Sequence, residues 1–426
     1  MLIPKELSEL PIYAVGGCVR DHLLGIEPKD VDLSSELTID EIIDYCNSKG
    51  IKTVVTGEQY GTVTILLDKS YEHTTFRKDL NCDGRHCDVE YVNDLVTDLS
   101  RRDFTINAMA MTYSGRVIDP FGGRKDLSLG VLRCVGNSVN RFTEDLLRII
   151  RLYRFKSKFD YIIAEETEEA AIELLPILNN NIFNTISIER VVQEFNKVFE
   201  NNEYNCGSFL TSMWFICVIK TIIPEMVGFD ELIQHPVYHP EGTVLDHVII
   251  VTELADAIHK WHALLHDIGK GKTAQLNGCG YYSFHNHENV GAALIPTILK
   301  RLRFSNDLID SILITTKFHM HPYYAQRTYG ETPPTKAIRK FQAACGDYLE
   351  DVRQVCLADS SNRIRPWIMF DKLDEPVIPV LMGKHLIEAG YQPGPVFGQV
   401  LKRAHDYQLE TGCSDIDQLI LEGVRI

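Results

Sequence analysis

The spacing of hydrophobic residues changes about a third of the way along the chain. Before that point, short apolar or β-branched runs alternate with turn residues, at positions 12–15, 53–57, 61–67, 72–76, 88–92 and 117–121. Runs of this length and composition predict β-strands. The segment VRDHLLG, which follows the first run, has helical spacing that ends at Gly25. The chain up to about residue 125 is therefore predicted to be an α/β head, a mixed β-sheet with helices.

From Asn140 onward, helical periodicity dominates and few strand signals follow. Proline and glycine interrupt this pattern near residues 234–242 and 322–334. A chain of 426 residues also exceeds what one hydrophobic core usually organises. We therefore predict four parts, an α/β head, an all-α neck, a helical body and a helical tail, at residues 1–139, 140–232, 233–330 and 331–426.

Composition indicates a globular protein. Hydrophobic residues make up 45% and charged residues 24% of the chain, a balance typical of globular domains. We expect no signal peptide, and no apolar run reaches the length of a membrane span, so we expect a cytoplasmic protein with no membrane partner. Eleven cysteines are scattered without the paired spacing of metal ligands, and we expect free thiols.

The charge distribution limits how the protein can contact nucleic acid. There are 59 acidic and 43 basic residues, a formal net charge of -16, which argues against a surface that binds nucleic acid everywhere. Arginines nevertheless cluster at Arg101 and Arg102 and again at Arg148, Arg151 and Arg154. The sequence is therefore compatible with a local basic cleft on an acidic protein.

The first motif is GGCVRDHLLG followed by KDVD. Its two glycines permit close approach of the backbone to a ligand, and the helix start after them offers free N–H groups to phosphates. Asp30 and Asp32 are two residues apart in a predicted strand, so both carboxylates can hold divalent metals on one face. An isolated Asp-x-Asp is more often a solvated turn, but the glycines and Arg20 favour a site. Glu72 is a candidate third carboxylate if its strand pairs beside this one, and a solvated strand face is the alternative.

Two further motifs follow. In RRDFTINAMA, Arg102, Asp103 and Asn107 have the chemistry to bind the ribose and triphosphate of a nucleotide. The alternative is a capped helix that begins at Asp103 or Thr105. In RFTEDLLRIIRLYRF, residues 141–155, one acidic and three basic side chains are spaced by threes along one predicted helix face: Asp145, Arg148, Arg151 and Arg154. An ordinary amphipathic helix with Glu–Arg pairs explains the same pattern.

Together the three motifs resemble the class II branch of the DNA polymerase β nucleotidyltransferase superfamily, which includes bacterial CCA-adding enzymes and poly(A) polymerases. The resemblance implies addition of CCA to the 3′ end of tRNA from CTP and ATP, with release of pyrophosphate. Residue by residue it implies Mg²⁺ binding by Asp30 and Asp32, nucleotide contacts by Gly17 and Arg20, ribose recognition by Arg102, Asp103 and Asn107, base reading by Asp145 and Arg148, and nucleotide or phosphate contacts by Arg151 and Arg154.

A fourth group of residues lies in the helical body, at His247, His266-Asp267, His287 and His319. This spacing resembles the HD metal-dependent phosphohydrolase superfamily, which implies an HD-type body and a second divalent metal. The superfamily often has His-Asp where this chain has His319-Met320. The pattern therefore leaves open whether this site is catalytic, and an active site of this kind would act on terminal or cyclic phosphates of RNA ends.

Several other functions stay open at this stage. A bacterial poly(A) polymerase shares the predicted chemistry, and some relatives add only CC or only A. A non-catalytic RNA-binding protein would predict loss of the acidic and basic motif residues of the head, all of which are present. A stand-alone HD nucleotide hydrolase would leave the head without a purpose. We expect the helical tail to help hold the tRNA. The sequence does not predict an oligomeric state.

Overall fold

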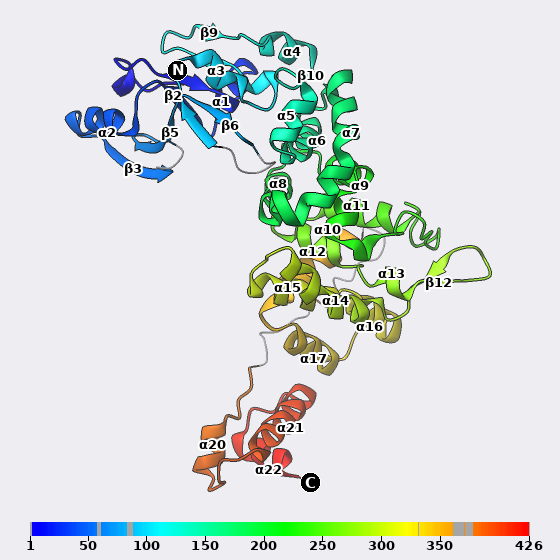
Figure 1. The fold of residues 1–426 in the computed structure, drawn as a ribbon. Coiled ribbons are helices and arrows are strands. Elements are labelled where there is room, and N and C mark those ends of the chain that lie inside the picture. The colour runs from blue at the N-terminus through cyan, green and yellow to red at the C-terminus, as the bar shows by residue number, and fades with distance from the viewer. Residues whose placement is uncertain are drawn as a thin grey trace. The chain divides into compact units, whose positions relative to one another are not determined.

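The computed structural model describes residues 2–57, 61–82, 88–330, 332–360, 370 and 378–425. The chain forms two compact units, Met1–Ile222 and Ile223–Ile426. The main sheet lies in the first unit, and the second unit is almost entirely helical (Figure 1). The predicted order, an α/β head followed by helical parts, is confirmed.

The head is built on a mixed β-sheet. Within the described residues the sheet has seven strands in the order β3-β4-β5-β2-β1-β8-β9. Their bounds are Lys52–Gly57, Thr62–Leu66, Ser70–Thr75, Val31–Ser35, Tyr13–Val15, Ala110–Met111 and Val117–Ile118. Strands β2 and β5 run parallel, and the other neighbours are antiparallel. Helices α1 (Gly17–Leu23), α2 (Ile39–Ser48) and α3 (Leu95–Ser100) belong to the same unit. Every predicted strand run corresponds to an observed strand.

A separate hairpin joins β6 (Arg77–Leu80) to β7 (Asp88–Tyr91). The expectation of free thiols is correct for nine cysteines and wrong for Cys82, which is disulfide-bonded. Cys82 lies just beyond β6, and its partner is outside the described residues. Two thiols that lie close together can pair without any metal-ligand spacing in the sequence.

The segment RRDFTINAMA does not form the capped helix that was the alternative reading. Only one 3-10 turn, Thr105–Asn107, forms there, and β8 follows it directly. Ile106 and Met109 are fully buried. The backbone extends because β8 pairs with β1, with Ala14 opposite Met111, and sheet pairing replaces helical hydrogen bonds.

The neck is helical, as predicted. Helix α4 (Gly123–Leu129) precedes it, and α5 (Ser138–Glu144) crosses its predicted start at residue 140. The helices that follow are α6 (Leu147–Phe159), α7 (Glu165–Asn181), α8 (Ile188–Phe199), α9 (Cys206–Phe215) and α10 (Val218–Ile222). A short parallel pair, β10 (Val131–Leu132) and β11 (Ile162–Ile163), accompanies them. The predicted continuous helix over 141–155 is wrong, because the chain is extended at Asp145, with φ -153° and ψ 101°.

The second unit begins with a helical body and ends with a small helical tail. The predicted body contains α11 (Val244–Leu254), α12 (Lys260–Leu265), α13 (Lys270–Thr273), α14 (His287–Arg301), α15 (Asn306–Phe318) and α16 (His321–Tyr329), with a hairpin of β12 (Gln275–Leu276) and β13 (Tyr282–Ser283). The predicted tail contains α17 (Thr335–Cys345), α18 (Leu349–Asp359), α20 (Gly383–Glu388), α21 (Val396–Thr411) and α22 (Ile416–Val424). Within the described ranges, no helix combines the length and apolar character needed to cross a membrane.

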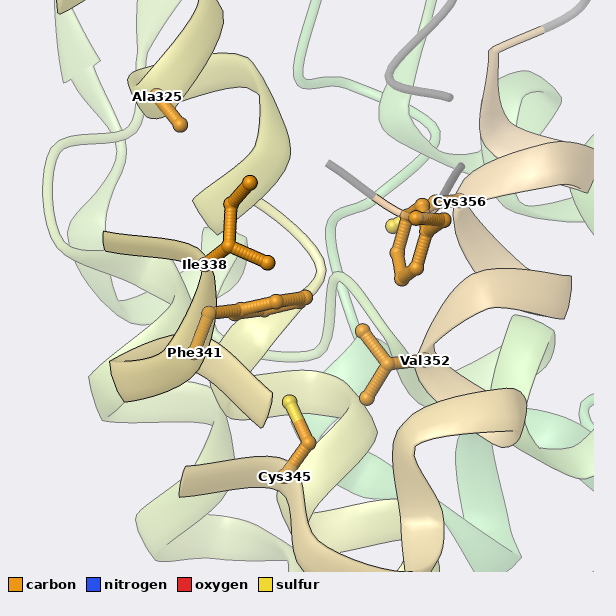
Figure 2. Close-up of a cluster of buried hydrophobic side chains, with 7 residues drawn as sticks. Ala325, Ile338, Phe341, Cys345, Val352 and Cys356 are labelled. Atoms are coloured by element: carbon orange, nitrogen blue, oxygen red, sulfur yellow. The ribbon is translucent and has the colours of Figure 1, made fainter. Parts of the chain in front are cut away.

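A buried apolar cluster fixes the position of α18. Ile338 and Phe341 of α17 face Val352 and Cys356 of α18 (Figure 2). All four are nearly inaccessible to solvent, and packing of this kind leaves little freedom for the helix to move. The consequence is a fixed position for Asp359, the last residue of α18.

Candidate functional site

A cavity of about 580 Å³ in the first unit collects the residues of all three head and neck motifs. The predicted site residues on its wall are Gly17, Arg20, Asp30, Asp32, Arg102, Asp103, Asn107, Asp145, Arg148, Arg151 and Arg154. They come from the β1–α1 turn, strand β2, the 3-10 turn after α3, the break before α6 and α6 itself. The fold therefore brings these eleven predicted residues to one cavity.

Three carboxylates crowd together beside this cavity. Asp30 directly precedes β2, and Asp32 lies within it, opposite Glu72 of the parallel strand β5. Loss of surrounding water raises the pKa of Asp32, with Asp30 adding to the rise and Arg102 opposing it. Burial and then the charges of Asp32 and Asp30 raise the pKa of Glu72. Carboxylates that repel one another in this way fit a divalent cation, whose charge would remove the repulsion.

The β1–α1 turn requires glycine for two reasons. Gly16 has φ +78° and ψ -132°, a backbone conformation that residues with a Cβ rarely adopt. A Cβ at this position would lie only 2.5 Å from Nη1 of Arg102. The glycine therefore allows the Arg102 guanidinium to lie against the turn, at the edge of the cavity.

A buried hydrogen-bond network connects the motif RRDFTINAMA to α1 and α6. Arg20 donates to Oδ1 of Asn107, and Nδ2 of Asn107 donates to Oδ1 of Asp103 at 2.9 Å. Nε and Nη2 of Arg151 donate to the other Asp103 oxygen at 2.9 and 2.6 Å. Burial opposes the charge of Asp103, but Arg151 and the Asn107 hydrogen bond hold its pKa well below the usual range. Asp103 is therefore ionised, and the network fixes this wall of the cavity.

Arg154 is held differently from its neighbours on α6. Its guanidinium is only 5% exposed, and it donates to Glu194 of α8 and to the Tyr204 hydroxyl. Arg151 also lies 3.6 Å from Glu194. Sequence reasoning missed Glu194, because a single acidic residue on an amphipathic helix is normally solvated. Here it anchors α6 to α8.

The predicted base-reading residues are both fixed by neighbours. Arg190 of α8 donates to both carboxylate oxygens of Asp145, at 3.2 and 2.7 Å, and the Leu147 N–H donates to Oδ1 at 3.2 Å. This arrangement ends α5 and starts α6, which explains the broken helix. Arg148 donates to Glu144 at 2.6 Å and to two backbone carbonyls. Sequence reasoning missed Arg190, since nothing in its local pattern connects it to an aspartate 45 residues away.

The second unit brings the four histidines of the fourth motif around one carboxylate. Oδ2 of Asp267 lies 3.4 Å from His247 Nε2 and 3.2 Å from His266 Nε2. Oδ1 lies 3.1 Å from His287 Nε2 and 3.5 Å from His319 Nε2. Each oxygen of Asp267 therefore faces its own pair of imidazoles, a geometry that suits two metal ions bridged by one carboxylate.

The imidazoles are oriented for metal binding. Nδ1 of His266, His287 and His319 bonds to a backbone carbonyl three residues earlier, at 2.7, 2.8 and 2.8 Å. A carbonyl only accepts, so Nδ1 carries the proton and the Nε2 lone pair points toward Asp267. Among the described atoms, His266 Nε2 is buried with no hydrogen-bond partner. These observations fit a divalent metal site.

Asp359 completes this cluster, and sequence reasoning missed it. Its Oδ1 lies 3.1 Å from Nε2 of His247, and both residues belong to a group that can hold a metal with His266. The superfamily pattern often has a carboxylate directly after the histidine that corresponds to His319, where the chain has Met320. It comes instead from the end of α18, too far along the chain for any spacing rule to connect the two.

Two segments of the chain match known domain families. Residues 12–133 match the poly A polymerase head domain, and residues 238–363 match the HD domain. The first match includes the three carboxylates beside the first cavity. The second includes the four histidines His247, His266, His287 and His319 together with Asp267 and Asp359. These six residues are called the metal-type cluster below.

Among curated relatives, the multifunctional CCA protein of Vibrio campbellii is 30% identical over 364 residues, 83% of this chain and 86% of that protein. The CCA-adding enzyme of Leuconostoc mesenteroides is 43% identical over 201 residues, 46% of this chain and 48% of that enzyme. The chain spans about half the length of the curated relatives that it matches at 39–43% identity.

A solved structure shares the fold over nearly the whole chain. The crystal structure of Bacillus stearothermophilus CCA-adding enzyme in complex with CTP matches with a TM-score of 0.64. The alignment covers 96% of this chain and 91% of that one, at 24% sequence identity. At this identity the likeness establishes a common fold.

Proposed function

The chain belongs to the family of CCA-adding enzymes, and on that premise we propose that it adds CCA to the 3′ end of tRNA from CTP and ATP, with release of pyrophosphate. The observation that carries this proposal is the single cavity lined by all eleven residues of the three head and neck motifs. Phosphoryl transfer, nucleotide binding and base selection require different chemistry. The residues assigned to each of these three tasks line the same cavity. The proposed partners are tRNA, CTP and ATP, and the proposed location is the cytoplasm.

We assign divalent metal binding to Asp30, Asp32 and Glu72, with Mg²⁺ as the proposed ion because all three ligands are hard carboxylate oxygens. A divalent ion held by these residues would supply charge neutralisation at the phosphates. In the transfer, the tRNA 3′-hydroxyl loses its proton to solvent, its oxygen bonds to the α-phosphorus, and the bond to pyrophosphate breaks. Arg102, held at the edge of the cavity by the glycine turn, is placed to bind phosphate or ribose oxygens. The backbone of Gly17 lines the same edge of the cavity.

The buried network has a supporting role in this proposal. Asp103 and Asn107 are about 7% and 6% exposed, and their polar atoms already bond to Arg151 and Arg20. We therefore assign them to positioning the two arginines. The arginines in turn present positive charge to the triphosphate, and Arg154 holds α6 in place through Glu194.

Base selection is assigned to Asp145 and Arg148. A carboxylate only accepts hydrogen bonds, so Asp145 pairs with the exocyclic amino group that C and A carry. U and G present a carbonyl oxygen at the corresponding edge, which would leave Asp145 facing another acceptor. Arg148 donates to the acceptor atoms of C or A beside the amino group. Oδ1 of Asp145 accepts from both Arg190 and the Leu147 N–H, whereas Oδ2 accepts one bond from Arg190 and keeps a lone pair for the base.

The experiment that tests this function uses purified protein, Mg²⁺ and tRNA transcripts that end before CCA, after C and after CC. Each labelled nucleotide is supplied alone and in combination, and the products are sized. Addition of C, C and A followed by arrest supports the proposal. Long A tails would instead identify a poly(A) polymerase, C-only or A-only products a divided enzyme, and no extension would refute the assignment.

A second activity is favoured by the cluster in the second unit. We propose that it hydrolyses terminal or cyclic phosphates at RNA ends, in a reaction where water oxygen bonds to phosphorus and one P–O ester bond breaks. Two divalent ions held by the histidines, Asp267 and Asp359 would supply the Lewis-acid chemistry. Lys270, whose Nζ pairs with Asp267, places a positive charge where a phosphate would bind.

This second activity is tested by metal analysis and by hydrolysis of adenosine 2′,3′-cyclic phosphate. The wild-type protein should retain about two divalent ions in its second unit and hydrolyse the cyclic ester, whereas Asp359→Asn should lose metal and hydrolysis together. Hydrolysis that is unchanged in Asp359→Asn would remove the cluster from the reaction.

A further inference from the structure

The cavity beside the metal-type cluster is larger than a phosphate needs, and aromatic side chains line its outer part. It measures about 660 Å³, within the range of sites that enclose a whole small ligand. Two short segments supply most of the aromatic lining, HPVYH at 235–239 and YYSFH at 281–285, and Tyr323 and Tyr324 of α16 add to it. Neither segment has a role in the functions proposed above.

Three rings form one continuous aromatic surface. The His235 ring lies 4.5 Å from that of Tyr281 and 4.8 Å from that of Tyr238, measured between centroids. Tyr238 is 64% exposed, so it is not part of the hydrophobic core. An exposed aromatic surface at the mouth of a cavity indicates a ligand-binding role, since leaving such rings in water is unfavourable.

This aromatic surface is connected rigidly to the metal-type cluster. The Tyr282 N–H donates to the Ile233 carbonyl at 2.8 Å, which joins the β12–β13 hairpin to the base of the 235–242 loop. At the inner end, Gln234 accepts from Lys270 at 2.7 Å, and Lys270 pairs with Asp267. At the other end of the loop, Glu241 bonds to Nδ1 of His247 at 2.7 Å. The aromatic surface and the cluster are thus held in one fixed relation.

We propose that His235, Tyr238 and Tyr281 form a nucleobase-stacking subsite, so that the second unit selects phosphates attached to a nucleoside. This inference rests on the proposed hydrolytic function of the same site. Flat aromatic rings bind any base through its face, without reading its edge. None of the three rings carries a fixed charge of its own that would favour an acidic or a basic ligand. The subsite therefore discriminates a nucleoside from a plain alcohol, and discriminates little between bases.

The test compares two cyclic esters that have the same five-membered phosphate ring, adenosine 2′,3′-cyclic phosphate and glycerol 1,2-cyclic phosphate. Only the first has a base. Tyr238→Ala in the full-length, metal-loaded protein should reduce kcat/KM for the adenosine ester about tenfold, the range expected for one lost stacking contact. The glycerol ester should be unaffected, and Tyr238→Phe, which keeps the ring, should behave as wild type. Equal losses for both esters, or no loss for either, would overturn the subsite.

A binding measurement separates failure of the subsite from failure of the hydrolytic function. Calorimetric titration with adenosine 2′-monophosphate needs no turnover, so it tests the subsite even if neither ester is hydrolysed. Wild type and Tyr238→Phe should bind with similar affinity, and Tyr238→Ala about tenfold more weakly. Tyr391→Ala, which removes an exposed tyrosine from the tail, is the matched control and should bind as wild type. Equal affinity for wild type and Tyr238→Ala would refute the subsite.

Discussion

At the scale of single residues, the base-reading aspartate depends on a partner from another helix. Asp145 lies in the extended link between α5 and α6, where its backbone carbonyl accepts from the Arg148 N–H at 3.0 Å. Its orientation comes from the paired bonds with Arg190, which is about a third exposed at its side chain. A bidentate guanidinium fixes the carboxylate plane as well as its position.

Removing Arg190 should therefore impair base choice more than the rate of transfer. Arg190→Ala is expected to lower the ratio of kcat/KM for CTP over UTP about tenfold, because a misaligned Asp145 no longer rejects the wrong base efficiently. Arg190→Lys should give a ratio between those of the wild type and Arg190→Ala, since an ammonium group cannot form the bidentate pair. Single-nucleotide addition to a tRNA that lacks CCA measures this ratio.

The matched control for Arg190 is Glu189→Ala, an exposed neighbour on the same helix. It should leave the CTP over UTP ratio at the wild-type value. An unchanged ratio in Arg190→Ala would show that Asp145 is held well enough by the Leu147 N–H alone.

At the scale of elements, the β1–α1 turn and the α17–α18 pair each position one site. The turn allows Arg102 to approach the backbone, and the packed helices place Asp359 beside His247. In both elements the functional side chain is held by residues that have no chemistry of their own. Their loss is expected to affect stability and function together.

Gly16→Ala should destabilise the first unit and abolish nucleotide transfer. The backbone conformation alone costs about 1–3 kcal/mol for a residue with a Cβ, and the new methyl group would also displace Arg102. Gly25→Ala is the control, because Gly25 also has a positive φ, +74°, but a Cβ there meets nothing within 4 Å. Urea unfolding and CCA addition should show loss of stability in both variants and loss of activity only in Gly16→Ala.

Phe341→Ala should destabilise the second unit by about 3–5 kcal/mol, the usual range for truncating a buried phenylalanine. Phe341 is 1% exposed and lies at the centre of the cluster in Figure 2. The variant should also retain less divalent metal, since α18 carries Asp359. Urea unfolding and metal analysis measure the two effects. Phe341→Leu should lose much less stability and much less metal than Phe341→Ala. Normal metal retention in a destabilised Phe341→Ala would show that α18 does not need this packing.

At the scale of the whole molecule, the two units carry separate chemistry. The carboxylates of the first lie in strands of the head sheet or directly before one, whereas the histidines and aspartates of the second lie in helices or close to their ends. The limits proposed for head, neck, body and tail, at residues 139, 232 and 330, stay predictions. The net charge of -16 implies that any tRNA contact depends on local basic groups such as those of the first cavity.

The two activities should therefore be separable by substitution. Asp32→Asn is expected to reduce CCA addition by several orders of magnitude and leave hydrolysis of the cyclic ester unchanged, because it removes a metal ligand from the first unit only. Asp267→Asn should reduce hydrolysis of the cyclic ester and leave CCA addition unchanged. Both assays are run on each purified variant. Loss of both activities in either variant, with folding intact, would show that the two sites are coupled.

The sequence alone determined most of the local structure and the core of each site. Strand and helix periods are local properties, so the sheet runs of the head and the helices after Asn140 were predictable. Asp30 and Asp32, or His266 and Asp267, are close in the chain, and short spacing fixes their relation in a strand or helix. The resemblance to a known family then connected the separate motifs.

Only the tertiary structure decided how distant segments meet. Arg190 reaches Asp145 across 45 residues, Glu194 reaches Arg154 across 40, and Asp359 joins the histidines from the end of another helix. No period or spacing in the sequence encodes such contacts, because they depend on how whole elements pack. The same reason explains the break at Asp145, where an ion pair with α8 prevails over a helical pattern that is locally complete.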